Sequence, residues 1–235
     1  MTLLEWIEAG VMAYDDTPTF TLYRMRFVDD SGDARDIVGV LGGLDVVDEG
    51  AGGVLPHERV TPTASTDRLD LTRATVANLS PIWGLSLASG LTDLLIEPGE
   101  FVASVTVDGV EHSVERVPDP ERVAALAAAV GSDDVLIADG HHRYGISRTS
   151  RDERREASDA SSPAEETLAF VSELVADQLS VESIHRLYSG IDRDALVAAL
   201  DLRFDRSPGG VADASTLSRM DADGALALIG PGGSV

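Results

Sequence analysis

The stretch Asp134-Val135-Leu136-Ile137-Ala138-Asp139-Gly140-His141-His142-Arg143-Tyr144 holds a short apolar run that breaks at a glycine. The β-branched run that ends at Ala138 predicts a strand, and the polar segment 143–157 is compatible with a helix. Gly140 stands at the turn between them. The stretch therefore predicts a strand, a glycine turn and the start of a helix.

Such a turn is suited to an anion. The first turn of a helix presents backbone N–H groups without partners in the helix, together with the positive end of the helix dipole. Gly140 lets a ligand approach the chain closely, and Arg143 supplies paired donors for phosphate or carboxylate. His141 and His142 can bond, transfer protons or ligate a metal. The alternative is an ordinary turn in which Asp139 caps the helix and the histidines are solvated.

The segment Ile137-Ala138-Asp139-Gly140-His141-His142-Arg143-Tyr144 resembles the central motif of the family called domain of unknown function 1015 (DUF1015). It is also similar, more distantly, to the Gly-x-x-Arg nucleotide loop of the ParB and sulfiredoxin-like fold. In that wider group some members bind or hydrolyse nucleoside triphosphates, and some are kinases of free serine. The resemblance implies a nucleotide-phosphate site.

Two further stretches match the family pattern. A His-Glu element after a proline, His57-Glu58, precedes a predicted helix that begins with Asp67-Arg68. The family also has a His-Arg pair after its next strand, matched here by His185-Arg186. Without the resemblance, Asp67 and Arg68 would indicate an ordinary surface helix. The resemblance covers residues 20–205, and only its central motif is highly specific.

The charge of the chain limits its partners. It has 235 residues, with 41 acidic against 18 basic side chains and a formal net charge of -23. Such a surface repels DNA, RNA and anionic lipid, so we expect no nucleic-acid and no membrane partner. A local arginine pocket can still hold a small anion through short charge-assisted hydrogen bonds.

The residue types that are missing also exclude mechanisms. All 18 basic residues are arginine, so the chain has no lysine nucleophile, Schiff base or Walker-type phosphate loop. It has no cysteine, which excludes disulfides, thiolate metal sites and the sulfiredoxin reaction. No apolar run reaches the length of a membrane span, and the N-terminus does not resemble a signal peptide. We expect a cytoplasmic protein.

Alternation and turn residues predict most of the remaining elements. The strongest signals are the hairpin around Asp108-Gly109 and the helix that begins after Asp119 with Pro120 and ends before Gly131. The segment 167–175 fits either a helix or a strand. We further predict helices within 1–10, 66–79, 143–157 and 191–204, and strands at 19–27, 37–41, 44–47, 82–87, 101–107, 110–117, 134–138 and 225–229.

These elements predict an α/β or α+β protein, with a mixed sheet, flanking helices and a ParB/sulfiredoxin-like core. We expect three segments. Residues 1–53 would form an N-terminal β-hairpin region packed on the core, 54–205 the central core that carries the site, and 206–235 a tail with a last strand.

Three turns rich in histidine would meet at one edge of the sheet. His57, Glu58, Asp139, His141 and His142 are the candidate catalytic residues. Gly140, Arg143, His185 and Arg186 would bind the cofactor, ATP or ADP, and Glu58 and Asp139 would hold Mg²⁺. The expected function is phosphoryl transfer from the nucleotide to a small polar metabolite.

Two other classes of function stay open. One is a regulator that binds a nucleotide without turnover. This is favoured by Gly145-Ile146-Ser147, which stand where the family has an acid and a threonine. The other is a zinc hydrolase that uses His57, His185 and one of the adjacent pair His141 and His142. Neither the acceptor, the nucleotide nor the oligomeric state follows from the sequence.

Overall fold

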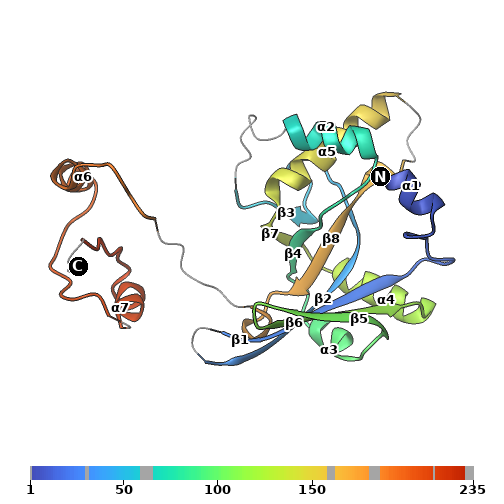
Figure 1. The fold of residues 1–235 in the computed structure, drawn as a ribbon, viewed down its shortest axis with the longest axis horizontal. Coiled ribbons are helices and arrows are strands. Elements are labelled where there is room, and N and C mark those ends of the chain that lie inside the picture. Colours follow the sequence, from blue (N-terminus) through green and yellow to red (C-terminus); the bar gives the residue numbers. More distant parts are fainter. Residues whose placement is uncertain are drawn as a thin grey trace. The chain divides into compact units, whose positions relative to one another are not determined.

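The computed structural model of the protein describes residues 2–29, 32–58, 66–157, 162–179, 186–213 and 215–230. Its contacts divide the chain into two compact units, residues 1–181 and 182–235. This division differs from the predicted segments 1–53, 54–205 and 206–235. The reason is that the N-terminal hairpin belongs to the central sheet, whereas the helix after residue 191 belongs to the second unit (Figure 1).

One mixed sheet organises the first unit, in the strand order β3-β7-β4-β8-β2-β1-β6-β5. Strands β3 and β7 pair in parallel, as do β4 and β8, and the other neighbours are antiparallel. The predicted mixed α/β class is therefore confirmed. The strands are β1 (Phe20–Val28), β2 (Ala34–Asp45), β3 (Val54–Leu55), β4 (Ile82–Ser86), β5 (Glu100–Val107), β6 (Val110–Val117), β7 (Val135–Asp139) and β8 (Glu166–Glu173).

Seven α-helices lie in the described part of the chain, five of them in the first unit. Helices α3, α4 and α5 contribute apolar side chains to the main core, which also includes Leu22, Val40, Ile82, Ile137 and Val171 from the strands. The helices are α1 (Leu3–Glu8), α2 (Thr66–Thr75), α3 (Leu91–Ile96), α4 (Pro120–Val130), α5 (His141–Ala157), α6 (Arg193–Leu200) and α7 (Thr216–Asp223).

Two glycines inside β2 leave room for aromatic rings from the neighbouring strands to lie against the β2 backbone. A Cβ on Gly39 would lie 2.3 Å from the Phe170 ring, and one on Gly42 would lie 2.4 Å from the Phe20 ring. The sequence predicted that Gly42 and Gly43 interrupt two short strands. That prediction was wrong, because both glycines pair with β8 inside one long strand.

The local signals with a clear backbone cause were correct. Asp108 and Gly109 both have positive φ, 49° and 83°, as the tight turn between β5 and β6 requires. The Asp119 side chain accepts a hydrogen bond from the Arg122 N–H at 2.8 Å, and Pro120 occupies the first turn of α4. The ambiguous segment near residue 170 is strand β8, because β2 and β4 both pair with it.

Other elements differ from the prediction. Helices α3 and α7 were not predicted; they span only six and eight residues. Helix α5 begins at His141, two residues earlier than expected. The predicted strand at 225–229 is absent: these residues are described, and none of them lies in a strand. The run is apolar, but only Ile229 in it is β-branched, and it is not paired in a sheet.

The second unit consists of α6, α7 and connecting segments. The Asp192 carboxylate caps α6 by accepting a hydrogen bond from the Ala195 N–H at 2.9 Å. Thr216 is the only buried residue among those described in this unit, so its described part has no buried apolar core. Within the described ranges, no helix is both long and apolar enough to cross a membrane.

Candidate functional site at the start of helix α5

The β7–α5 turn has a backbone that requires glycine. Gly140 has a φ of +95°, and its carbonyl accepts the first helical hydrogen bond, from the Tyr144 N–H at 2.9 Å. A Cβ at this position would lie 3.0 Å from Nε of Arg143 and 3.1 Å from Cγ2 of Ile82. Gly140 therefore allows both the left-handed turn and the return of the Arg143 side chain over it.

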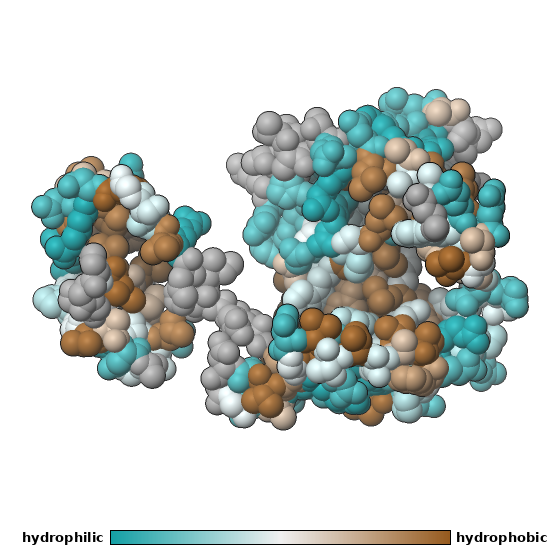
Figure 2. All heavy atoms as spheres, viewed as in Figure 1, coloured by the Kyte–Doolittle hydropathy of each residue, from teal (hydrophilic) through white to brown (hydrophobic). Residues whose placement is uncertain are grey.

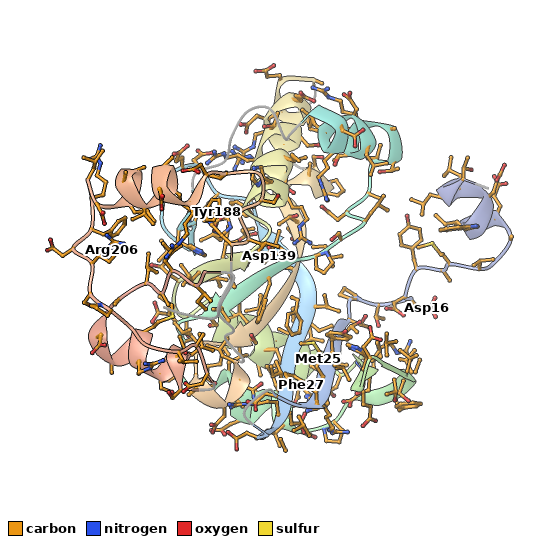
Figure 3. All side chains as sticks on the ribbon, turned by 60° about the vertical axis from the view of Figure 1, so that its left-hand side comes forward. Asp16, Met25, Phe27, Asp139, Tyr188 and Arg206 are labelled. Atoms are coloured by element: carbon orange, nitrogen blue, oxygen red, sulfur yellow. The ribbon has the colours of Figure 1, made fainter. Side chains whose placement is uncertain are left out.

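Arg143 joins three segments of the chain. Its guanidinium donates hydrogen bonds to the Asp139 carboxylate, the Pro81 carbonyl and Oγ of Ser80, the last at 2.6 Å. Its side chain is one quarter exposed, whereas that of Asp139 is 71% exposed. In Figure 3, Asp139 lies at the end of its strand. The guanidinium thus holds the turn against the residues that lead into β4.

Two histidines that are 84 positions apart meet at this turn. The His57 N–H donates a hydrogen bond to Nε2 of His141 at 3.3 Å, and the two rings meet edge to face at 4.4 Å. His57 follows β3, the strand that pairs with β7, so the sheet brings both residues to one edge. The predicted meeting of His57 with the 139–143 turn is therefore present in the structure.

The hydrogen bond also sets the protonation of His141. Because Nε2 accepts a hydrogen bond, the neutral ring carries its hydrogen on Nδ1, which faces Oε2 of Glu58 at 3.8 Å. Burial lowers the pKa of His141, and neighbouring His57 lowers it further, while Glu58 and Asp139 act in the opposite direction. His141 is therefore a neutral imidazole next to the Glu58 carboxylate. The Glu58 side chain is 64% exposed.

His142 points differently from His141. Its Nε2 atom is buried and has no hydrogen-bond partner among the described residues. A buried polar nitrogen without a partner is unfavourable. The adjacent histidines thus have different surroundings, as expected for neighbouring residues in a helix.

Tyr144, the last residue of the motif, anchors α5 to the end of β2. Its hydroxyl accepts a hydrogen bond from the Val47 N–H at 2.9 Å and donates one to the Asp45 carbonyl at 3.2 Å. Burial raises the pKa of this phenol. The hydroxyl is therefore protonated at neutral pH and has a structural role.

Ser147 stands in the segment that departs from the family pattern. Its Oγ donates to the Arg143 carbonyl at 3.1 Å and lies 2.8 Å from Oγ1 of Thr167 on β8. Thr167 in turn donates to the Asn78 side chain at 3.2 Å. This polar chain links α5 to the sheet, so the residues after Tyr144 are used in packing.

The His-Arg pair predicted for the site belongs to the second unit of the chain. His185 lies outside the described residues. Arg186 is described, is exposed and belongs to the second unit. In the described ranges, no three His, Asp or Glu side chains are grouped so that they could hold a metal ion. Asp67 and Arg68 are exposed at the start of α2.

Sequence reasoning missed several residues that shape the region. Ser80 and Pro81 could not be identified from the sequence as partners of Arg143, because a serine hydroxyl and a backbone carbonyl belong to no recognisable motif. Arg151 also gave none, since it lies in a polar helix expected to face solvent. It is 2% exposed and donates to the Val46 carbonyl, to Asp48 at 2.5 Å and to Asp152 at 2.8 Å.

The fold and this turn define a mixed α/β protein with a glycine-arginine motif at a strand-to-helix junction. The model of the family described as protein of unknown function (DUF1015) matches residues 1–228. The chain therefore belongs to the DUF1015 family. No curated protein and no solved structure matches it.

Proposed function

We propose that this protein binds a nucleotide at the β7–α5 turn and transfers a phosphoryl group to a small polar metabolite. The observation that carries the proposal is the contact between His57 and His141 beside Arg143, at the start of a 17-residue helix. Phosphoryl transfer needs mainly positioning and neutralisation of charge. The turn, the guanidinium and the exposed carboxylates nearby are groups of the required kind.

The phosphates would lie against the first turn of α5. The N–H groups of its first residues have no partners within the helix, and the dipole favours an anion. Because Gly140 has no side chain, the Arg143 guanidinium lies directly over the turn, where a phosphate bound to these N–H groups would meet it. This arrangement would correspond to the Gly-x-x-Arg loop of the ParB and sulfiredoxin-like fold, with Gly140 and Arg143 as its two defining residues.

Arg143 would have to exchange partners. In the structure it donates to Asp139, Ser80 and Pro81. A phosphate oxygen would replace the Asp139 carboxylate, which is mostly exposed and so can turn into solvent at low cost. The bonds to Ser80 and Pro81 would keep the guanidinium in place during the exchange.

Glu58 is the best candidate for the general base. His141 already accepts a hydrogen bond at Nε2, so that nitrogen is not free to take a proton from an acceptor hydroxyl. The Nδ1–H group faces Glu58 and would orient its carboxylate. We therefore assign His57 and His141 to positioning and Glu58 to proton transfer.

Glu58 and Asp139 also suit Mg²⁺, which binds carboxylate oxygens and commonly takes only one or two from the protein, with phosphate oxygens and water as the rest. Both side chains are more than half exposed and can therefore reach a bound nucleotide. Magnesium would neutralise the phosphate charge in this acidic protein. Asp139 would become available once a phosphate oxygen replaces it at Arg143, and it would hold the ion while Glu58 stays free as the base.

The test is to incubate the protein with ATP or ADP, Mg²⁺ and pools of amino acids and of sugars, and to detect phosphorylated product by mass spectrometry and ³¹P NMR. Nucleotide affinity is measured in parallel. Arg143→Ala should weaken binding by about tenfold or more, since it removes a charge-assisted hydrogen bond. Arg148→Ala is the matched control, because Arg148 lies on the same helix in an exposed ion pair with Glu49. Equal affinities of the two variants would reject the site.

A regulator that binds a nucleotide without turnover is the second candidate. It is favoured by the complete set of protein partners around Arg143 and by the packing role of Ser147. Binding without product, for every acceptor tested, would support it. A zinc hydrolase has less support, because no three His, Asp or Glu side chains in the described part of the chain are grouped so that they could hold the ion. Stoichiometric zinc in the purified protein would favour that third candidate.

A further inference from the structure

Strand β5 leaves one edge of the sheet open. It is the last strand in the sheet order, next to β6 alone, and all eight of its residues are exposed. In Figure 1 it lies at the rim of the first unit, and Figure 2 shows hydrophobic residues along the same strip. Along such an edge, alternate backbone N–H and C=O groups point away from the neighbouring strand.

Beyond its first residue, the charged Glu100, this strand has no side chain that protects the edge. The segment Phe101-Val102-Ala103-Ser104-Val105-Thr106-Val107 has no charge, no proline and no glycine. Phe101, Val102, Val105 and Val107 are 68%, 59%, 58% and 49% exposed. A bulge between Phe101 and Ala103 interrupts only the beginning of the strand, so residues 103–107 pair regularly with β6. Charges and prolines are the usual protection against pairing with another strand.

An apolar face of the sheet continues from this edge. Val105 lies opposite His112 on β6, and His112 lies opposite Met25 on β1, so the three side chains point to the same face. Figure 3 shows Met25 and Phe27 on β1, two positions apart and therefore on one face. Residues 101–107 thus form the rim of a wider surface with little charge.

We propose that two copies of this chain associate through β5, which pairs antiparallel with the β5 of the other copy across a two-fold axis. With the axis at Val105, Ser104 lies opposite Thr106 and Ala103 opposite Val107. Every such pair is uncharged, and β-branched or hydroxyl pairs of this kind stabilise antiparallel strands. An antiparallel strand is complementary to itself, so one surface serves both partners.

The net charge of the chain favours an uncharged surface, such as this edge, for any contact between two copies. At -23, two copies repel each other over most of their surfaces, and repulsion is weakest where both present an uncharged strip. The same argument predicts that salt strengthens the association, because it screens repulsion between the remaining surfaces. A basic peptide bound at this edge would show the opposite dependence on salt.

The first measurement is sedimentation of the whole chain over a range of concentrations, at low and at high salt. We expect the mass to double as concentration rises, at lower concentration in high salt. Val105→Glu places two carboxylates opposite each other on the axis and should abolish the dimer. Val28→Glu is the control, because Val28 is an exposed valine at the end of the interior strand β1. Circular dichroism verifies that both variants are folded.

The second measurement uses the absence of cysteine from the chain. Val105→Cys should form a disulfide-linked dimer on mild oxidation, since the two introduced thiols would face each other, and Val28→Cys should stay monomeric. The proposal is overturned if the wild-type chain remains monomeric under all conditions. It is also overturned if a dimer persists in Val105→Glu, which would place the contact on another surface. Neither result bears on nucleotide binding at α5.

Discussion

The backbone N–H of His57 donates a hydrogen bond to Nε2 of His141, and this bond joins the loop after β3 to the first residue of α5. His141 is 6% exposed, so the bond is largely protected from water. It keeps His141 neutral and aims its Nδ1–H group at Glu58. His141 of the DUF1015 motif thus contacts both residues of the His-Glu element, His57 through Nε2 and Glu58 through Nδ1–H.

This bond predicts a particular titration of His141. Its folded pKa lies below 6.5, because burial and His57 disfavour the charged ring. The unfolded chain therefore takes up the proton first as pH falls. The contribution of His141 to stability is complete above the unfolded pKa and is lost as pH decreases below it. We expect ¹⁵N-detected NMR at neutral pH to show the Nδ1–H tautomer, with a titration midpoint below 6.5.

His141→Asn identifies the resonance and removes this pH dependence. The variant should also free the 57–58 loop, which hydrogen exchange at the His57 amide would detect as faster exchange. A histidine spectrum in which the residue carries its proton on Nε2 would contradict the assignment. So would a midpoint at or above the usual histidine value.

Gly140→Ala should lower the free energy of unfolding by about 1–3 kcal/mol, because an L-residue is strained at positive φ. The new Cβ would also press on Arg143 and Ile82. A double-mutant cycle with Arg143→Ala separates the two causes. If the arginine contact contributes, Gly140→Ala will cost less in the Arg143→Ala background; equal costs would assign the effect to the backbone strain and the contact with Ile82.

Arg143→Ala should itself destabilise the protein, independently of any ligand. It removes the bonds that tie α5 to Ser80 and Pro81, and a loss of about 1–3 kcal/mol is expected for a partly buried charged donor. Chemical denaturation measures it, with Arg148→Ala expected within about 0.5 kcal/mol of wild type. An unchanged stability of Arg143→Ala would mean that the three contacts are not formed in solution.

A buried ion pair between β1 and β6 predicts that the stability of the protein decreases in acid. Nε of Arg24 donates to Glu115 at 2.9 Å, and the Gly99 N–H donates to the same carboxylate at 2.8 Å. Burial alone would raise the pKa of Glu115, but these hydrogen bonds outweigh it and leave the pKa below its usual value. The resulting stability is present above the unfolded pKa and is lost as pH falls through the folded one.

Glu115→Gln should therefore destabilise the protein at neutral pH, by about 3 kcal/mol if Arg24 is left without a counter-charge. It should also flatten the dependence of stability on pH below 5. Glu111→Gln on the same strand is exposed and serves as control. Urea unfolding at several acidic and neutral pH values measures both effects. Parallel curves for Glu115→Gln and wild type would show that Glu115 does not cause the acid sensitivity.

Several features could be predicted because they depend on neighbouring residues. The Asp108-Gly109 hairpin, the capped start of α4 and the strand, glycine and helix around Gly140 all follow from local backbone preferences. The failures have long-range causes. Gly42 and Gly43 lie within a strand because they pair with Ala169 and Leu168 of the distant strand β8, which no local pattern reveals.

The candidate site also contains residues that could be predicted from the sequence and residues that could not. The motif residues could be found from their order in the sequence, but the partners of Arg143 could not. Ser80 and the Pro81 carbonyl are brought to it by the pairing of β4 with β7, and that pairing depends on the whole sheet. Arg151 is buried for a similar reason, because β2 ends beneath the middle of α5.

The sequence by itself determined the class of fold, the family and the position of the glycine-arginine turn, since periodicity, turn residues and motifs are properties of adjacent residues. Only the tertiary structure decided that His57 meets His141, that Arg143 is held by Ser80 and Asp139, and that β5 remains at an open edge. These outcomes depend on strand order. Strand order follows from pairings between distant segments, whose free energies are shared across the whole core.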